Sequence, residues 1–512
     1  MKKTRILALV LAVLMLAGIF AGCAKTPASS TAPAPSQTTD SKTESQKPQE
    51  LVDIVWYVYA AAVRNNEKNV VAAMNEYSKE KIGVTVTLNT LLSTDYKNKL
   101  SMDLASDADI DMMFLASWQG QQDLIQSKAV MDITDLLPNY PKLLAVMPEE
   151  IWTSAEFGGR RYLIPNYKEA FLGYSYLTPK AVADKVKAEK GIDFKTIELN
   201  GVLDLEKIAP YVKAAKEVCG VTVGFGELGL WNAQCIKPGQ WEVISGSYYV
   251  DNKTDKVNDY RLTDEYEQFL NTVYQLNKDG LIPEEAATKD YVANILTDYL
   301  KKGDYATEHW TTVPDNENNA SMRYNTEVYA IPLTGNYQNS GIATGSDYAI
   351  AAKSKKADAC LRYLELLNTD TKLADMYVYG QEGVDFKYNA DGLVEVSENK
   401  GWDNAVWKCC SYLTPTLAST EAKDKKEQYT EANKSATAYR SLGFRADTTA
   451  VKAEMAAVDN VAEQYSAYLN YGFYKAEDKL EEYRTELKKA GIEKVIAEMQ
   501  SQYDAWLKEV GK

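Results

Sequence analysis

Residues 51–59, LVDIVWYVY, open a series of strand and helix patterns that decides the fold. This stretch is β-branched and aromatic, which predicts a buried strand. Apolar residues then recur at helical spacing over 65–81, VTVTL (84–88) predicts a second strand, Leu100 and Leu104 mark another helix, and IDMMFL (110–115) predicts a third strand. Strand–helix–strand units with right-handed crossovers build a parallel sheet that helices cover on both faces. The sequence therefore predicts an α/β fold.

Aromatic residues accompany the strands of this predicted sheet. Trp56 and Tyr57 lie toward the end of the first strand, and Ser117-Trp118 follow the third. In open sheets of this kind, ligands sit beyond the carboxyl ends of the strands. We therefore expect the ligand near Tyr57 and Trp118, while Trp56 is also compatible with a place in the core.

The composition excludes several classes of function. The chain has 512 residues and a net charge of −15, so nucleic acid and anionic lipid surfaces would repel it. It holds one histidine, His309, which excludes any catalytic or metal scheme that needs two imidazoles. Tyr (35) outnumbers Phe (10) and is joined by nine Trp, a bias that suits polar ligands with apolar faces.

The first 50 residues predict export and tethering. Lys2, Lys3 and Arg5 precede the apolar stretch 6–20, which is too short to be a typical membrane span and indicates a signal peptide over residues 1–22. It closes on Phe20-Ala21-Gly22-Cys23, which resembles the bacterial lipobox and implies that Cys23 is diacylated; an uncleaved N-terminal anchor is the alternative. Residues 24–50 hold ten Ser or Thr and four Pro but no Val, Ile, Leu or aromatic residue, so we expect a disordered tether whose ends lie about 30 Å apart.

Five further cysteines do not predict a disulfide framework. Cys219, Cys235, Cys360, Cys409 and Cys410 are odd in number and show no CxxC spacing. We expect buried thiols, with a bridge between Cys219 and Cys235 as the alternative.

The remainder of the chain predicts further helices and hairpins. Helices are expected over 205–218, 262–278 and 357–367, hairpins at 248–260 and at Asn389–Gly392, and a strand at 347–352. From Asp447, which is placed to cap a helix, three apolar stripes predict a helical C-terminal segment. We expect these stripes to be packing surface rather than a binding face.

The order of these features resembles one family. The lipobox, the tether, Trp56-Tyr57, the segment 111–118 and YLIPNY (162–167) are similar to those of extracellular solute-binding lipoproteins of carbohydrate ABC importers, the maltose-binding-like group. The tail, with VKAE (451–454), KAGI (489–492) and AEMQ (497–500), resembles a C-terminal domain of uncharacterised role found in one Firmicute subgroup. The resemblance covers residues 51–512. It departs at Phe444-Arg445-Ala446-Asp447, where Phe-x-Phe-Asp is commoner.

The resemblance implies a type II periplasmic-binding-protein-like fold of two lobes whose chain crosses the hinge near Pro165 and Pro332. The first lobe would comprise 51–165 and about 333–400, and the second 166–332 with part of 401–446, while 447–512 would pack on a lobe. The lobes would close around a solute, with ligand contacts to both lobes favouring the closed state. The implied partners are a small solute, here an oligosaccharide, the subunits of an ABC permease and the membrane through the lipid anchor. We expect an extracellular monomer with no metal, no cofactor and no enzyme activity.

The expected binding residues follow from the strand ends and the hinge. Trp118 is the first candidate for stacking on a sugar ring, and Trp310, beside Glu308 and His309, is the candidate for the opposing wall. Two further tryptophans, Trp231 and Trp407, are weaker candidates. Polar contacts are expected from Asn166, Tyr167 and Lys168 at the hinge, and also from Glu308 and Asp347.

The sequence also contains features of other classes of function. Residues 224–229 match the letters of a GxGxxG dinucleotide fingerprint, but Pro238 and Gly239 interrupt the helix that should follow. Asp251, Asp255 and Asp259 lack the spacing of a calcium loop, which favours a solvated hairpin. A tethered glycoside hydrolase needs two carboxyl groups across the scissile bond, which 72 acidic residues do not exclude. A structural or adhesive lipoprotein also remains open.

Overall fold

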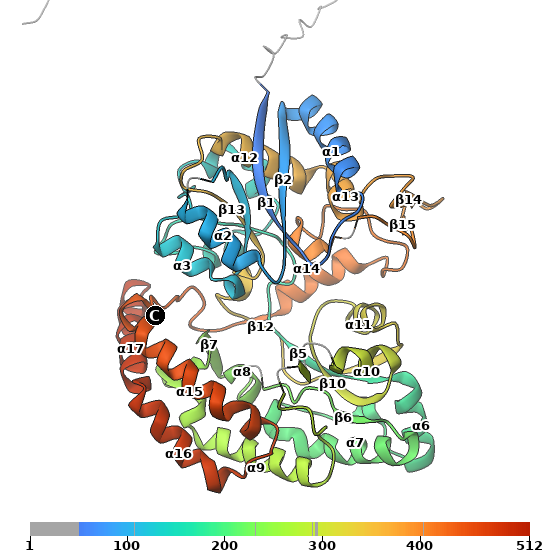
Figure 1. Ribbon diagram of the computed structural model, residues 1–512, viewed down its shortest axis with the longest axis vertical. Coiled ribbons are helices and arrows are strands. Elements are labelled where there is room, and N and C mark those ends of the chain that lie inside the picture. The colour runs from blue at the N-terminus through green and yellow to red at the C-terminus, as the bar shows by residue number, and fades with distance from the viewer. Residues whose placement is uncertain (1–50, 107, 231, 289, 292–294, 403) are drawn as a thin grey trace, which may run out of the picture. The chain divides into compact units, whose positions relative to one another are not determined.

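The computed structural model describes residues 51–512 apart from 107, 231, 289, 292–294 and 403 (Figure 1). The predicted signal peptide, Cys23 and the tether lie outside the described residues, as does Trp231. Among the helices of the described part, none combines the length and the apolar character that crossing a bilayer requires.

A five-stranded sheet in the order β2-β1-β3-β13-β4 organises the first lobe. Strands β1, β2 and β3 pair in parallel, as predicted, whereas β13 is antiparallel to both β3 and β4. The sheet is therefore mixed rather than wholly parallel. Its strands are β1 Val52–Ala60, β2 Val84–Leu92, β3 Met112–Leu115, β4 Ile164–Pro165 and β13 Asp347–Ile350.

Alternation along β1 explains why both faces of this sheet are covered. Trp56 and Val58 point into one hydrophobic cluster, and Tyr57 points into another on the opposite face. Trp56 is fully buried against the ring of Tyr377, at 4.7 Å between ring centroids, so it belongs to the core. The helices of this lobe, of which the sequence predicts α1, α2 and α12, are α1 Glu67–Ile82, α2 Tyr96–Ala105, α3 Gln121–Gln126, α4 Pro141–Leu144, α5 Glu149–Ser154, α12 Ala357–Thr369 and α13 Thr371–Tyr379.

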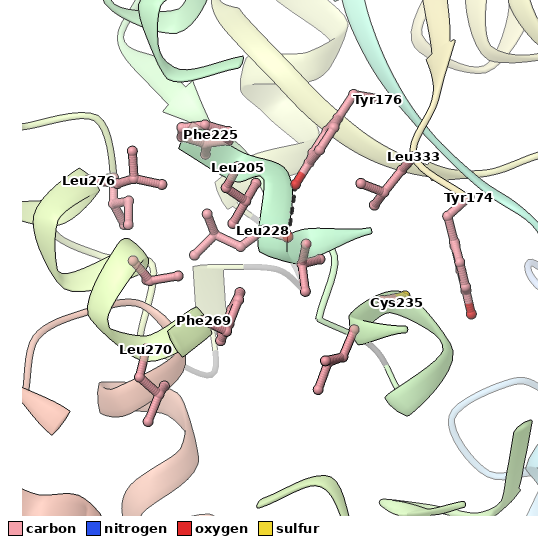
Figure 2. Packing of buried hydrophobic residues seen from close by; sticks show 14 of the residues in the cluster. Tyr174, Tyr176, Leu205, Phe225, Leu228, Cys235, Phe269, Leu270, Leu276 and Leu333 are labelled. Carbon is pink, nitrogen blue, oxygen red and sulfur yellow. Dashed lines mark hydrogen bonds between the residues drawn. The ribbon is translucent and has the colours of Figure 1, made fainter. Parts of the chain in front are cut away.

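A four-stranded sheet in the order β11-β5-β10-β6 organises the second lobe. Figure 2 shows how its core is built: Tyr176 donates a hydrogen bond of 2.8 Å to the carbonyl of Leu228 beside Phe225 and Phe269. The predicted helices 205–218 and 262–278 and the hairpin 248–260 are confirmed. The elements are β5 Tyr174–Pro179, β6 Val223–Phe225, β7 Trp241–Ser245, β8 Tyr248–Asp251, β9 Lys256–Asp259, β10 Tyr305–Thr311, β11 Val328–Pro332, α6 Lys180–Lys190, α7 Leu205–Cys219, α8 Ala233–Ile236, α9 Asp264–Lys278, α10 Leu296–Lys302 and α11 Asn316–Tyr324.

The chain passes between the two sheets three times. It leaves the first sheet after β4 and enters the second at β5, and it returns between β11 and β13. After α14 (Lys425–Ser435) it passes again, where β16 (Thr437–Ala438) pairs in parallel with β12 (Tyr337–Gln338). Trp402, Cys409 and Cys410 still pack in the core of the first lobe, whereas Phe444 packs in that of the second. The hairpin predicted at Asn389 is also confirmed, by β14 (Phe386–Tyr388) and β15 (Val394–Val396).

The C-terminal segment forms three helices, α15 Lys452–Asn470, α16 Ala476–Lys489 and α17 Ile492–Glu509. Their buried residues, among them Val458, Tyr483 and Val495, belong to the same hydrophobic cluster as Phe269 of α9. The prediction that Asp447 caps the first helix is wrong, because α15 begins at Lys452 after a short 3-10 turn, η9 Thr449–Val451. The Asp447 carboxylate instead accepts a hydrogen bond of 2.9 Å from the Thr449 N–H.

The GxGxxG motif serves packing. A Cβ at Gly224 would lie 2.2 Å from the carbonyl oxygen of Leu281, and one at Gly226 would lie 1.9 Å from the Glu308 carboxylate. Helix α8, which follows the motif, spans only Ala233–Ile236 and is too short to hold a phosphate in the manner of a dinucleotide-binding helix.

Two other expectations are decided by burial. Asp259 is fully buried in an ion pair of 2.6 Å with Arg261, so the acidic hairpin is solvated only in part. None of the five cysteines that the structure describes forms a disulfide, which excludes the bridge between Cys219 and Cys235 from this structure. Four of them are buried, as expected, and Cys219 is half-buried.

Candidate ligand-binding site

A cluster of aromatic rings lies at the carboxyl edge of the first sheet. Trp118 stands in the turn η1 (Ser117–Gln119) that follows β3, and Tyr59 stands at the end of β1, which is parallel to β3. Phe114 comes from β3 itself, and Trp407 comes from the turn η8 (Val406–Lys408). Because β1 and β3 run in the same direction, their final residues meet at one edge of the sheet.

One ring of this cluster, that of Trp118, is exposed to solvent although its position is fixed by its neighbours. Trp118 lies 5.6 Å from Tyr59 in an edge-to-face arrangement, 6.3 Å from Phe114 and 6.2 Å from Trp407, between ring centroids. Its indole N–H donates a hydrogen bond of 2.9 Å to the carbonyl of Gly345, which fixes the orientation of the ring. Trp118 is nevertheless 50% exposed, whereas the side chains of Tyr59 and Trp407 beside it are less exposed than that of Trp118. A large apolar face is thus held in place and presented to solvent.

Two predicted polar residues lie together where the chain first leaves the sheet. Asn166 donates through its backbone N–H to the carbonyl of Ser346 and through its side chain to the Ser346 hydroxyl, each at 3.0 Å. Asp347, the next residue, accepts a hydrogen bond of 2.6 Å from the side chain of Gln121. Both side chains are buried, and neither the amide oxygen of Asn166 nor the second carboxylate oxygen of Asp347 has a donor among the described residues. Such atoms are where ordered water or a ligand is most needed.

Burial also changes the protonation of Asp347. Its carboxyl lies away from water, which raises its pKa to about 8, although the bond from Gln121 and the positive charges of Arg445 and Lys168 act in the opposite direction. At neutral pH the protonated form therefore predominates, so this group is both a donor and an acceptor of hydrogen bonds.

Other predicted residues have roles inside the protein. Tyr57 is buried, donates a hydrogen bond of 3.1 Å to Asp103, and has a pKa raised by burial. Tyr167 packs in the core of the first lobe. Lys168 forms an ion pair with its neighbour Glu169, and both side chains are largely buried.

Two predicted contact residues of the second lobe, Trp310 and Glu308, lie on β10. Trp310 is half-buried, with its ring 5.6 Å from that of Tyr324 and the Arg323 guanidinium 5.7 Å from its centroid. Its indole N–H is buried and has no acceptor among the described residues. Glu308 is buried and accepts a hydrogen bond of 3.0 Å from the Glu227 N–H, and burial raises its pKa well above the usual range.

The structure thus brings Trp118 together with Trp407, and Asn166 with Asp347. It also assigns to the aromatic cluster Tyr59 and Phe114, two residues that are not among the contacts predicted from the sequence. Alternation could have identified Tyr59, because residues two apart on a strand face the same side and Tyr59 is closer than Tyr57 to the carboxyl end.

Comparison with known proteins gives this geometry a context. Residues 440–508 match a family described as a domain of unknown function, DUF3502. A carbohydrate ABC transporter substrate-binding protein of Streptococcus pneumoniae serotype 4 is 26% identical over 463 residues, which cover 87% of this chain and 89% of the relative.

Several solved structures share the fold of this chain. The N-glycan transport solute binding protein (NgtS) of Streptococcus pneumoniae superimposes with a TM-score of 0.77 at 22% identity, covering 89% of this chain and 99% of the other. The same protein in complex with Man1GlcNAc gives a TM-score of 0.72 at 22% identity, over 89% of this chain and 100% of the other. An HMO-binding, ABC-transporter-associated solute-binding protein of Bifidobacterium longum infantis gives a TM-score of 0.57 at 15% identity, over 89% of this chain and 99% of the other. The chain therefore has the fold of the type II solute-binding proteins, is related to the substrate-binding proteins of carbohydrate ABC transporters, and carries a DUF3502 domain at residues 440–508.

Proposed function

We propose that this protein captures an oligosaccharide outside the cell and delivers it to an ABC permease. The observation that carries the proposal is the half-exposed face of Trp118, held on a base of Tyr59, Phe114 and Trp407 at the carboxyl edge of the first sheet. Sugar rings present C–H groups that pack on such an aromatic face, while their hydroxyls need polar partners at its edge. The carbohydrate complexes of NgtS support the same class of ligand.

In this proposal the ligand lies between the two lobes. Trp118 and Trp407 form one wall, and Trp310 contributes to the other. Asn166 and Asp347 supply polar contacts near the crossings, and their unpaired oxygens support this role. Lys168, which forms an ion pair with Glu169, stays a predicted contact. Trp231 stays a predicted contact. Tyr57, Tyr167 and Glu308 act from behind these residues, because their side chains are engaged inside the lobes.

Capture follows from lobe closure and needs no covalent step. A ligand that touches both lobes binds the closed state more tightly than the open one and so shifts the population toward it. The closed monomer then docks on the permease. Diacylation of Cys23 holds the protein at the outer face of the membrane, and the tether 24–50 lets the folded part reach the permease.

A thermal-shift screen tests this function. The chain is heated with mono- and oligosaccharides, including Man1GlcNAc and Man5GlcNAc, and with amino acids and peptides as controls. A ligand that binds only the folded state stabilises it through mass action and so raises the melting temperature. When the ligand concentration is a hundred times Kd, the free energy of unfolding increases by about 2.7 kcal/mol. Stabilisation by peptides and by none of the carbohydrates contradicts the proposal, and cleavage of a bound oligosaccharide would establish a hydrolase instead.

A further inference from the structure

Residues 445–452, at the start of the DUF3502 domain, contact the first lobe as well as the second. We call these residues the strap. Arg445 donates a hydrogen bond of 2.8 Å to the carbonyl of Ser154 in α5 and another to the carbonyl of Ser340 in the second crossing. Its guanidinium also lies 4.4 Å from the centroid of Phe157, in the first lobe.

The strap is anchored on the second lobe from both ends. Just before it, the Ser441 hydroxyl donates to the Glu242 carboxylate of β7, and Phe444 packs on Tyr503 of α17 with ring centroids 5.1 Å apart. Just after it, α15 packs against α9 through the core of the second lobe. The residues on both sides of the strap therefore belong to the second lobe.

The strap itself forms hydrogen bonds and an ion pair with helix α3 of the first lobe. Gln122 donates to the Ala446 carbonyl, and Gln126 donates to the Asp447 carboxylate at 3.0 Å and accepts from Thr449 at 3.3 Å. Lys452 lies 3.5 Å from the Asp123 carboxylate. Several side chains of one short helix are thus engaged by the strap.

Helix α3 is joined directly to the candidate site. It begins at Gln121, immediately after Trp118, Gln119 and Gly120, and the Gln121 side chain binds Asp347. A helix of six residues is not stable by itself, so its position depends on tertiary contacts such as those of the strap.

We propose that the strap is a positioning element for ligand capture: it holds α3 against the second lobe and so sets the place of Trp118. The inference rests on the proposed function, because it assumes that Trp118 contacts the ligand. It gives the DUF3502 domain a role in binding although none of its residues needs to touch the solute.

The test combines two surface substitutions in the full chain, Gln126→Ala and Lys452→Ala, which remove strap contacts without opening a core. The matched control is Lys494→Ala, which breaks the ion pair between Lys494 and Glu454 inside the C-terminal helices. Amide hydrogen exchange is measured without carbohydrate, and the Kd for Man5GlcNAc is measured by calorimetry.

We expect hydrogen exchange over residues 117–127 to accelerate in the double variant and not in the control. The melting temperature of the double variant should be unchanged, and its Kd should rise about fivefold. If the double variant exchanges over 117–127 at the wild-type rate, the proposal that the strap positions α3 is wrong. The proposal is also wrong if Lys494→Ala accelerates exchange there equally. If the wild type binds neither Man5GlcNAc nor Man1GlcNAc, the proposed ligand fails, while the exchange measurement still decides whether the strap holds α3.

Discussion

The indole rings of Trp118 and Trp407 lie 6.2 Å apart, between centroids, although they come from turns at distant points of the chain. Only the fold brings them together, since η1 follows β3 whereas η8 belongs to the segment after the β14–β15 hairpin. Trp407 supports the ring of Trp118 from one side, and Tyr59 supports it from another. The exposed face of Trp118 is thereby preorganised for stacking.

Substitution of Trp118 tests the platform. Trp118→Ala should weaken oligosaccharide binding about tenfold or more, which corresponds to ~1.4 kcal/mol, because it removes the exposed apolar face. Trp118→Phe is the matched control, since it keeps an aromatic face, although a smaller one, and loses the bond to Gly345. The melting temperature of each variant shows that it is folded. A folded Trp118→Ala protein with wild-type affinity would remove this residue from the site.

The contribution of two buried carboxyls to the stability of the protein should fall as the pH rises from about 5 to 9. Burial raises the pKa of Asp347 and that of Glu242 to about 8, above the ordinary values of 3.8 and 4.5 that hold in the unfolded chain. The folded state therefore keeps protons that the unfolded state releases in this range, and each group lowers the free energy of unfolding by at most about 1.4 kcal/mol per pH unit. Above pH 9 both states are ionised and this contribution levels off.

Chemical denaturation at several pH values checks this effect. Asp347→Asn should flatten the slope of stability against pH between 5 and 8, and Glu242→Gln should do the same. The exposed Asp391, in the turn of the β14–β15 hairpin, provides the control substitution Asp391→Asn. Equal slopes in the wild type and in both buried variants would show that neither carboxyl is protonated in the folded state.

Local pattern predicts the elements with a strong period. The β-branched run at 51–59 and the stripes of the last three helices have the periods of a strand and of helices, so these elements could be identified from the sequence. The antiparallel placement of β13 could not, because a short apolar run carries no information about which neighbour it pairs with.

The candidate site was predictable in part for the same reason. Trp118 follows a strand end, which is a local signal, but its support by Trp407 is a contact between distant segments. Tyr57 and Glu308 were predicted as contacts from their residue type and position, and their internal partners Asp103 and Glu227 could be seen only in three dimensions.

Removal of residues 447–512 should destabilise the second lobe. Leu480, Tyr483, Leu487 and Val495 of this segment are buried in one cluster with Phe269 of α9. Full burial of each large apolar side chain contributes about 1.5–3 kcal/mol, and several together approach the stability of a typical domain. The truncated chain should therefore melt at a lower temperature and bind a hydrophobic dye. A truncated chain that melts like the full protein would show that these helices fold independently.

A single glycine tests the junction between these helices and α9 more finely. Gly472 adopts φ +70°, and a Cβ there would lie 2.5 Å from the carbonyl oxygen of Val273 and 2.8 Å from the Cα of Tyr274, both in the backbone of α9. Gly246 adopts φ +54° with no atom within 4 Å of the corresponding Cβ, so Gly246→Ala incurs only the backbone strain of about 1–2 kcal/mol.

Gly472→Ala incurs that strain and must also push the loop away from α9, because two backbones cannot yield as a flexible side chain would. We expect Gly472→Ala to lower the free energy of unfolding clearly more than Gly246→Ala and to accelerate hydrogen exchange in α9 and at the end of α15. Both variants are compared by urea denaturation under one set of conditions. An equal loss of stability in the two variants would mean that the loop and α9 separate at little cost. The C-terminal segment would then be held on the second lobe by the contacts of α16 and α17 rather than by this loop.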